Sequence, residues 1–300
     1  MRRLSNSLLT EIDDAIQKLP GSTPAQKLLV STVLEHLDRT VKDSAGDPQM
    51  EVDAANAYIR LGNVQSSPYH QNIGDTPGAS ASLDKALSIA IAVTRKHPEN
   101  TAAKQALGLA HKSRGDFLFG IARTQQAVFE MRSAIAAFEE LASVRGLTPD
   151  AKVDALLNAA GAYMHLGDEF GMVGWPSLSD FPSALGAYRT GGKIYERAAQ
   201  IELANPSVLR GIVEIHRRVG AIQLHTDPAG AVSELRNAMK GMDALHEQAK
   251  QSMEFRRLEA GVLGLPMANP ETENAPRRRM ATASRTSFAC PLGRCPHALD

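Results

Sequence analysis

Apolar and polar positions along the chain repeat in a pattern centred on an aromatic residue followed by Leu-Gly. The pattern is clearest at Tyr58-Ile-Arg-Leu-Gly62 and returns, with substitutions, around Gly115, Gly167 and Gly220. The intervals between these four glycines are 53, 52 and 53 residues. A fixed period in this range is typical of repeat arrays, in which each unit buries its apolar face against its neighbours.

A small–large–small triplet follows each glycine, with steps of four and then three residues. These steps place all three side chains on one face of a helix. The triplets are Ala79-Leu83-Ala86, Ala127-Met131-Ala134, Ala184-Tyr188-Gly191 and Ala231-Leu235-Ala238. We name the helix with Leu-Gly helix A and the helix with the triplet helix B. Together the two signals predict an all-α fold, a solenoid of antiparallel helix pairs with a period of 52–53 residues.

Helix caps set the boundaries of four expected repeats, which are 48–99, 100–147, 148–204 and 205–251. Asp47, Thr148 and Asn205 each precede a proline at the first helical position, and Asn100 is expected to cap the remaining helix A. Within residues 1–47, two helices at 5–19 and 24–44 are expected to cap the array. Residues 252–265 are a candidate C-terminal capping helix, and the Pro- and Arg-rich residues 266–300 are expected to be a disordered tail.

The repeated glycine has an expected steric role. Because it lacks a Cβ, the two helices of a pair can cross closely, and we expect the first alanine of the triplet to meet it there. The glycine-to-alanine distance is 17 residues in repeats one and three, but 12 and 11 residues in repeats two and four. Repeats one and three therefore carry an insertion in the A–B turn, and both insertions should project from one edge of the solenoid.

Composition and charge exclude several functional classes. The chain has 33 basic and 33 acidic residues, so it offers no bulk attraction to nucleic acid or to an anionic membrane. No apolar run is long enough to span a membrane, and acidic residues interrupt the N-terminal stretch where a signal peptide would be apolar. We therefore expect a cytoplasmic protein without a membrane span.

Motifs for catalysis, cofactors or metals are missing from the sequence, including His-Glu-x-x-His, Gly-x-Ser-x-Gly and the phosphate-binding loop. His111 and His216 fill the aromatic position of their repeats and are expected to be packing residues. Cys290 and Cys295 both lie in the tail, so no disulfide framework is expected to hold the fold, and with His297 they offer only three ligands at a wider spacing than zinc sites usually have. The sequence therefore predicts no enzyme, no cofactor and no metal site.

The aromatic–Leu-Gly signature on helix A and the triplet on helix B together resemble the tetratricopeptide repeat, whose usual unit has about 34 residues. The resemblance implies a right-handed superhelical solenoid whose concave groove binds a protein or peptide. In this family certain helix A positions line the groove. In this chain they correspond to Asn56, Arg60, Asn63, Lys112, Asp116, Met164, His165, Asp168, Arg217 and Arg218. Ile59 replaces the lysine with which some members grip a peptide carboxylate.

The insertions offer a second candidate surface for a partner. Tyr69 in repeat one and Phe170 and Trp175 in repeat three are large apolar residues that we expect on loops. Loop aromatics either fold back to fill the turn or serve as anchors in a protein interface. The sequence leaves both alternatives open.

A narrower resemblance covers roughly residues 2–250. Asn6-Ser-Leu-Leu, Leu19-Pro-Gly-Ser-Thr-Pro and Tyr58-Ile-Arg-Leu-Gly-Asn are similar to the repeat region that follows the kinase domain in bacterial, acidobacterial-type serine/threonine kinases. The kinase motifs themselves, a Gly-rich loop, His-Arg-Asp and Asp-Phe-Gly, are missing. The resemblance implies a non-enzymatic scaffold linked to kinase signalling. The alternative is an orphaned regulatory fragment of such a kinase, extracytoplasmic if the kinase is membrane-anchored.

Overall fold

The structure is a computed structural model that describes residues 30–32, 34–35, 37–39, 41, 46–69, 72–202 and 205–243. The helix expected at 5–19, the candidate capping helix at 252–265 and the expected tail at 266–300 lie outside these ranges. Of the helix expected at 24–44, the described residues from 30 to 41 are helical, and Val30 and Leu37 are buried in a cluster with residues of the first helix pair.

Helices make up the ordered elements of the described residues, which contain no strand. Their bounds are α3 (Pro48–Gln65), α4 (Thr76–Lys96), α5 (Thr101–Gly120), α6 (Thr124–Ser143), α7 (Pro149–Gly171), α8 (Phe181–Ile201), α9 (Pro206–Thr226) and α10 (Pro228–Asp243). For the residues that the structure describes, the prediction of an all-α fold is confirmed. None of the helices within these ranges is both long and apolar enough to cross a membrane.

Side-chain caps begin the helices where the sequence places them. Asp47 accepts hydrogen bonds from the backbone N–H groups of Gln49 and Met50 at 3.0 and 3.4 Å. Asn100, Thr148 and Asn205 cap α5, α7 and α9 in the same way. Each cap satisfies a donor that the first helical turn leaves unpaired, which typically stabilises a helix by about 1 kcal/mol. The expected helix starts are confirmed.

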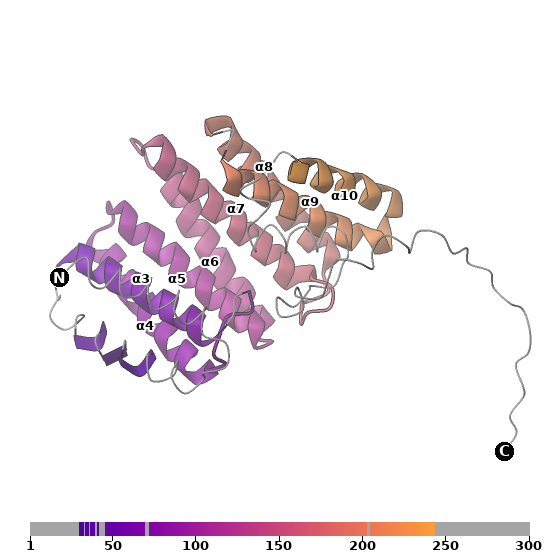
Figure 1. Cartoon of the computed structure of the whole chain (residues 1–300). Coiled ribbons are helices and arrows are strands. Elements are labelled where there is room, and N and C mark those ends of the chain that lie inside the picture. Colours follow the sequence, from indigo (N-terminus) through magenta and orange to yellow (C-terminus); the bar gives the residue numbers. More distant parts are fainter. Residues whose placement is uncertain are drawn as a thin grey trace, which may run out of the picture.

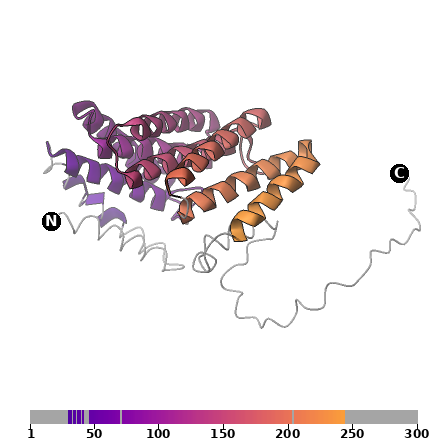
Figure 2. The ribbon, with the colours of Figure 1, turned by 90° about the horizontal axis from the view of Figure 1, so that it is seen from above.

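The helices pack in chain order across the molecule (Figures 1 and 2). Each helix from α3 to α9 contacts the next, and α3, α5, α7 and α9 also contact one another in succession. These four helices therefore form one layer, with α4, α6, α8 and α10 packed against them. Side chains such as Tyr58, Phe138 and Tyr188 are completely or almost completely buried between the helices.

The repeated glycines allow the two helices of each pair to cross closely, but the residue that faces each glycine is not the expected alanine. A Cβ on Gly62 would lie 2.6 Å from Cγ of Leu83, and one on Gly167 would lie 2.3 Å from Cε1 of Tyr188. The expected partner, the first alanine of the triplet, is not the nearest side chain. The large central residue of the triplet reaches further across the crossing than an alanine methyl can, and the missing Cβ makes room for it.

The structure also repeats at twice the expected period. In the first insertion, the backbone N–H of Ile73 donates to Val64 at 3.0 Å; 105 residues later, Leu178 donates to Glu169 at 2.9 Å. The bounds of α4 and α8 are related by the same shift of 105 residues. The insertions in repeats one and three are therefore folded alike, and the array consists of two related units of four helices.

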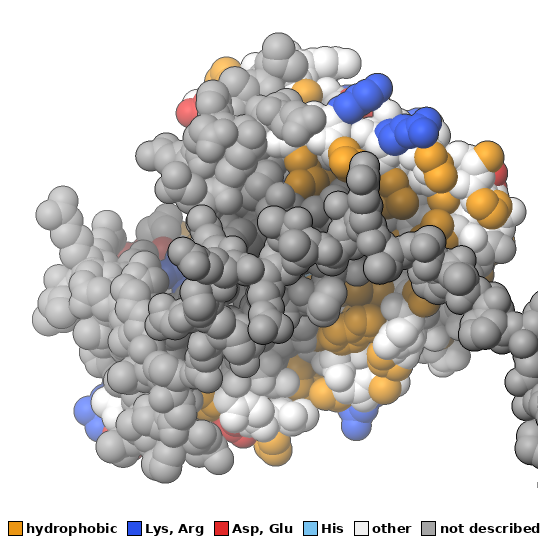
Figure 3. Space-filling view, turned by 45° about the vertical axis from the view of Figure 1, so that its right-hand side comes forward, with side chains coloured by type: hydrophobic (Ala, Val, Ile, Leu, Met, Phe, Trp, Pro, Cys, Tyr) orange, Lys and Arg blue, Asp and Glu red, His pale blue; other side chains and the backbone are white. Residues whose placement is uncertain are grey.

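The C-terminal helices expose apolar side chains. Leu224 on α9 is 52% exposed, and Val232 and Met239 on α10 are 45% and 48% exposed. Figure 3 shows hydrophobic side chains on the side of the molecule that carries these helices. The sequence predicts a capping helix at residues 252–265, shortly after the end of α10.

Candidate binding site

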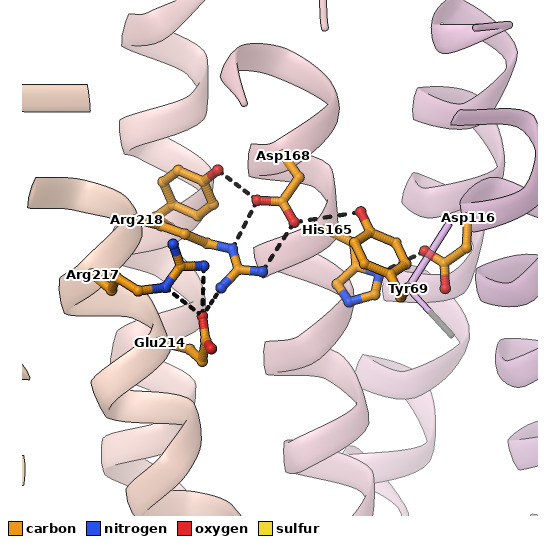
Figure 4. Close-up of polar contacts among 8 residues, drawn as sticks. Tyr69, Asp116, His165, Asp168, Glu214, Arg217 and Arg218 are labelled. Atoms are coloured by element: carbon orange, nitrogen blue, oxygen red, sulfur yellow. Dashed lines mark hydrogen bonds and ion pairs between the residues drawn. The ribbon is translucent and has the colours of Figure 1, made fainter. Parts of the chain in front are cut away.

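Expected groove residues from neighbouring helices meet in the structure (Figure 4). On α5, the ammonium group of Lys112 donates to Oδ2 of Asp116 at 2.9 Å. Oδ1 of Asp116 lies 2.5 Å from Nδ1 of His165 on α7. Asp116 is only 8% exposed, so these two partners compensate for the water that its carboxylate has lost. This contact ties α5 to α7.

Asp168 on α7 organises the other half of the cluster and is fully buried. It accepts from the hydroxyl group of Tyr188 on α8 at 2.7 Å and from Nε and Nη2 of Arg218 on α9 at 2.8 and 3.3 Å. Arg218 also donates to Glu214, as does Nη2 of Arg217 at 3.0 Å. We call this set the polar network. It consists of Lys112, Asp116, His165, Asp168, Tyr188, Glu214, Arg217 and Arg218.

The first insertion reaches into the polar network through Tyr69. The ring of Tyr69 lies against His165, with centroids 4.4 Å apart and an interplanar angle of 39°. Its hydroxyl group donates to Oδ2 of Asp168 at 3.4 Å, across 99 residues of sequence (Figure 4). Of the two alternatives for this loop aromatic, the structure shows the inward-folded one, and it joins the two candidate surfaces.

Burial and ion pairing act in opposite directions on the network carboxylates. Burial by itself would raise the pKa of Asp116, but His165 and Lys112 hold that pKa well below its usual range. For Glu214, burial is likewise outweighed by Arg218 and Arg217, which lower its pKa. Both groups are therefore ionised at neutral pH. Their negative charges are balanced by basic side chains of the same molecule.

Glu169 is the exception, and no pattern in the sequence singles it out. It follows Asp168 on α7 and is 1% exposed, yet neither carboxylate oxygen has a hydrogen-bond partner. Burial raises the pKa of Glu169 to about 9, and the charges of Asp116 and Asp168 contribute to the shift. Its carboxyl group is therefore neutral at pH 7. Val64 occupies the equivalent position in the first four-helix unit.

The expected groove residues on α3 stand apart from the polar network. Nδ2 of Asn63 lies 3.5 Å from the Ser113 hydroxyl oxygen on α5, and these residues precede Asp168 and Arg218 by 105 residues. The amide oxygen of Asn56 is buried without a hydrogen-bond partner, whereas Arg60 is exposed. Met164 on α7 is partly buried against the apolar core. The expected groove residues on α5, α7 and α9, apart from Met164, thus belong to the polar network, and those on α3 lie outside it.

The second insertion, residues 172–180, is held at both ends. Asp180 donates from its backbone N–H to Phe170 at 2.8 Å, in addition to the Leu178 bond described above. Trp175 stacks on Phe119 of α5 with centroids 5.8 Å apart, but remains 40% exposed. Val173 is 52% and Leu178 is 41% exposed. The loop therefore has a fixed path and presents large apolar side chains to solvent.

Phe170 corrects one sequence expectation, since it lies in the last turn of α7 and not on the inserted loop. Its ring packs against the core, and Cζ of Arg132 lies 5.9 Å from the ring centroid. Gly171 ends α7 and packs against α8, where a Cβ on it would lie 2.8 Å from the Ala184 methyl carbon. Phe170 is thus a packing residue.

The two histidines at the aromatic position make equivalent contacts. Nδ1 of His111 lies 2.7 Å from Glu130, and Nδ1 of His216 lies 2.6 Å from Glu234. Each pair links helix A to helix B of its own repeat. Because the same pair recurs in both four-helix units, it is best explained as part of the packing, as the sequence suggests.

Metal binding has no support in the described ranges, where no group of three or more His, Cys, Asp or Glu side chains is arranged to hold an ion. Comparison of the chain with protein-family models and with curated proteins found no match. A function for this protein is therefore inferred from the geometry of the polar network and of the second insertion.

Proposed function

We propose that the protein is a non-enzymatic scaffold, a tetratricopeptide-like solenoid that binds a protein or peptide partner along the edge formed by residues 172–180. The observation that carries this proposal is the exposure of Val173, Trp175 and Leu178 on a loop whose path is fixed by hydrogen bonds. A rigid loop loses little conformational entropy when a partner binds, and aromatic side chains are frequent anchors in interfaces.

The polar network supports the edge more than it offers a binding surface of its own. Lys112, Asp116, Asp168 and Arg218 are paired with one another or with His165, and a partner would have to break these contacts to use them. Breaking a buried ion pair leaves an uncompensated charge and is costly. The network therefore fixes α5, α7 and α9 relative to each other, while the adjoining loop contacts the partner.

A role in serine/threonine kinase signalling rests on the resemblance of residues 2–250 to kinase-associated repeat regions, and it is part of the same proposal. A scaffold and a regulatory fragment of a kinase would use the same surface. They differ in whether the partner is a separate protein or a kinase domain, which the capture experiment below identifies.

The test is affinity capture from native lysate with the full chain as bait, followed by binding measurements with the purified partner. The test variant is Val173→Ser/Leu178→Ser, which leaves the stack of Trp175 on Phe119 in place. The matched control is Phe129→Ser, because Phe129 on α6 is 68% exposed and lies outside this loop. We expect the double variant to weaken partner binding at least about tenfold and the control to leave it unchanged.

Equal binding to the wild type and to the Val173→Ser/Leu178→Ser variant would overturn the assignment of the edge. Loss of binding in a Lys112→Glu/Arg217→Glu variant that retains its helical circular dichroism would then return the partner to the groove.

A further inference from the structure

The outer face of α10 is exposed, whereas the equivalent face of α6 is buried. The small–large–small triplets align the two helices with a shift of 104 residues. Val128 and Ile135 on α6 are 9% and 6% exposed, and their equivalents Val232 and Met239 on α10 are 45% and 48% exposed. Helix α7 packs against α6, but the structure describes no helix after α10. The face of α10 therefore carries the residues of a surface that a following helix A covers.

The residues with which α7 covers α6 have a defined spacing, with steps of three, four and three residues. They are Val153, Leu156, Ala160 and Tyr163. The first three share a buried apolar cluster with Ile135 and Phe138 of α6. The hydroxyl group of Tyr163 donates to Glu139, also on α6, at 2.9 Å. A helix that covers α10 in the same way would need apolar side chains at the same steps.

The segment 252–265, which lies outside the described ranges, has this spacing. Its large apolar residues are Phe255, Leu258, Val262 and Leu265, again with steps of three, four and three residues. In this alignment Gly261 and Gly264 take the positions of Ala159 and Ala162, which are 1% and 0% exposed on α7. Small residues thus recur where the crowded positions of the helix require them.

Distances along the chain place this segment where the next helix A belongs. From the first alanine of a triplet to the aromatic position of the following helix A, the array has intervals of 32, 36 and 32 residues. Leu265 lies 34 residues after Ala231, the first alanine of the last triplet. Residues 244–251 separate the described end of α10 from the segment, which is an ordinary length for a connection between packed helices.

We infer that the exposed face of α10 is a docking surface for residues 252–265 of the same chain, which bind there as a fifth helix A. Apolar side chains at positions i, i+3 and i+7 are the usual anchors of a helix that packs into a groove. The short connection also holds the segment near α10, at an effective concentration that a separate chain does not reach. The chain itself thus closes the end of the array, as a solenoid requires.

The first test is photo-crosslinking of the purified full chain with a benzophenone amino acid at position 239. The matched control carries it at position 129, because Phe129 is also an exposed apolar residue on a helix B. Digestion and mass spectrometry identify the joined peptides, and a denaturing gel separates crosslinks within one chain from those between two chains. We expect position 239 to join residues 252–265 of the same chain and position 129 not to join them.

The second test is amide hydrogen exchange of residues 252–265 in substituted full-length chains. Met239→Ser and Leu258→Ser should each speed exchange at least about fivefold, because each removes one apolar side chain from the interface. The controls are Phe129→Ser on α6 and Leu263→Ser, whose position falls between the apolar steps. Both controls should leave the exchange of the other amides in the segment unchanged. Met239 is 48% exposed, so its substitution leaves the buried core intact.

Crosslinks from position 239 to a second chain would overturn the inference and make this face an interface between two copies. Crosslinks to other parts of the chain, with none to residues 252–265, would also overturn it. So would exchange that stays unchanged in both Met239→Ser and Leu258→Ser. Because both tests use the purified protein alone, their outcome is independent of the partner capture proposed above.

Discussion

The buried carboxyl group of Glu169 makes a prediction about stability that depends on pH. We consider Glu169→Val, because Val64 occupies the equivalent position in the first four-helix unit. In the folded chain the pKa of Glu169 is raised to about 9, against its ordinary value of 4.5. The folded state therefore keeps a proton that the unfolded chain releases. Stability decreases with pH wherever the folded state binds more protons, so this group destabilises the fold progressively between pH 4.5 and 9.

The magnitude of this destabilisation follows from the width of the pH range between the two pKa values of Glu169. Each pH unit within it changes the free energy of unfolding by about 1.4 kcal/mol, so at pH 7 the penalty is about 3 kcal/mol. Glu169→Val removes this term. The smaller side chain also leaves space unfilled, which costs about 1–2 kcal/mol, but that cost does not change with pH. Relative to the wild type, the free energy of unfolding of Glu169→Val should therefore rise by about 4 kcal/mol between pH 5 and pH 8.

The assay is urea denaturation followed by circular dichroism at several pH values from 5 to 8, with the difference between variant and wild type as the readout. Other titrating groups are common to both proteins and cancel in this difference. The control is Glu214→Gln. Arg218 and Arg217 outweigh burial and lower the pKa of Glu214, so its contribution is present above the ordinary value of 4.5 and is lost only below it. The difference in the free energy of unfolding between this control and the wild type should therefore be constant from pH 5 to pH 8. A constant difference for Glu169→Val would show that Glu169 is ionised in the fold and would refute the reasoning.

Two further predictions concern packing and charge. Gly167→Ala should destabilise the fold by about 1–3 kcal/mol in thermal or urea unfolding, because its Cβ would lie 2.3 Å from the Tyr188 ring. Gly186→Ala on α8, where a Cβ meets nothing within 4 Å, should stabilise by about 0.5–1 kcal/mol; a loss there would contradict the explanation. Asp168→Asn should cost about 3 kcal/mol, since Arg218 loses a charged partner. Asp154→Asn, at an exposed position of the same helix, should change stability by less than about 0.5 kcal/mol.

Much of the fold was predictable because its signals are local and repeated. Caps such as Asp47 and Thr148 act within one helical turn, so the sequence alone locates the helix starts. The glycine pattern correctly indicated close crossings, but the identity of the facing residue depends on side-chain reach. For that reason Leu83 and Tyr188, and not the preceding alanines, fill the contacts.

The candidate site was predictable only in part. Helix register placed Asp116, His165 and Asp168 on related faces, and the structure pairs Asp116 with His165 and Asp168 with Arg218. These pairs could not be foreseen, because they depend on the distance between helices separated by about 50 residues of sequence. Tyr69 reaches Asp168 from a loop, which has no periodicity to predict its path. Glu169 differs from an ordinary surface glutamate only through burial, which the sequence does not show.

The central claim, that a partner binds along residues 172–180, is tested most directly by photo-crosslinking inside cells. In separate variants, a benzophenone amino acid replaces Leu178, which is 41% exposed on this edge, Phe129, which is 68% exposed on α6, or Arg60, an exposed residue of the expected groove on α3. The account predicts that irradiation joins a partner to position 178 and none to position 129. Crosslinks at position 129, or at a groove position such as Arg60, with none at position 178, would contradict it.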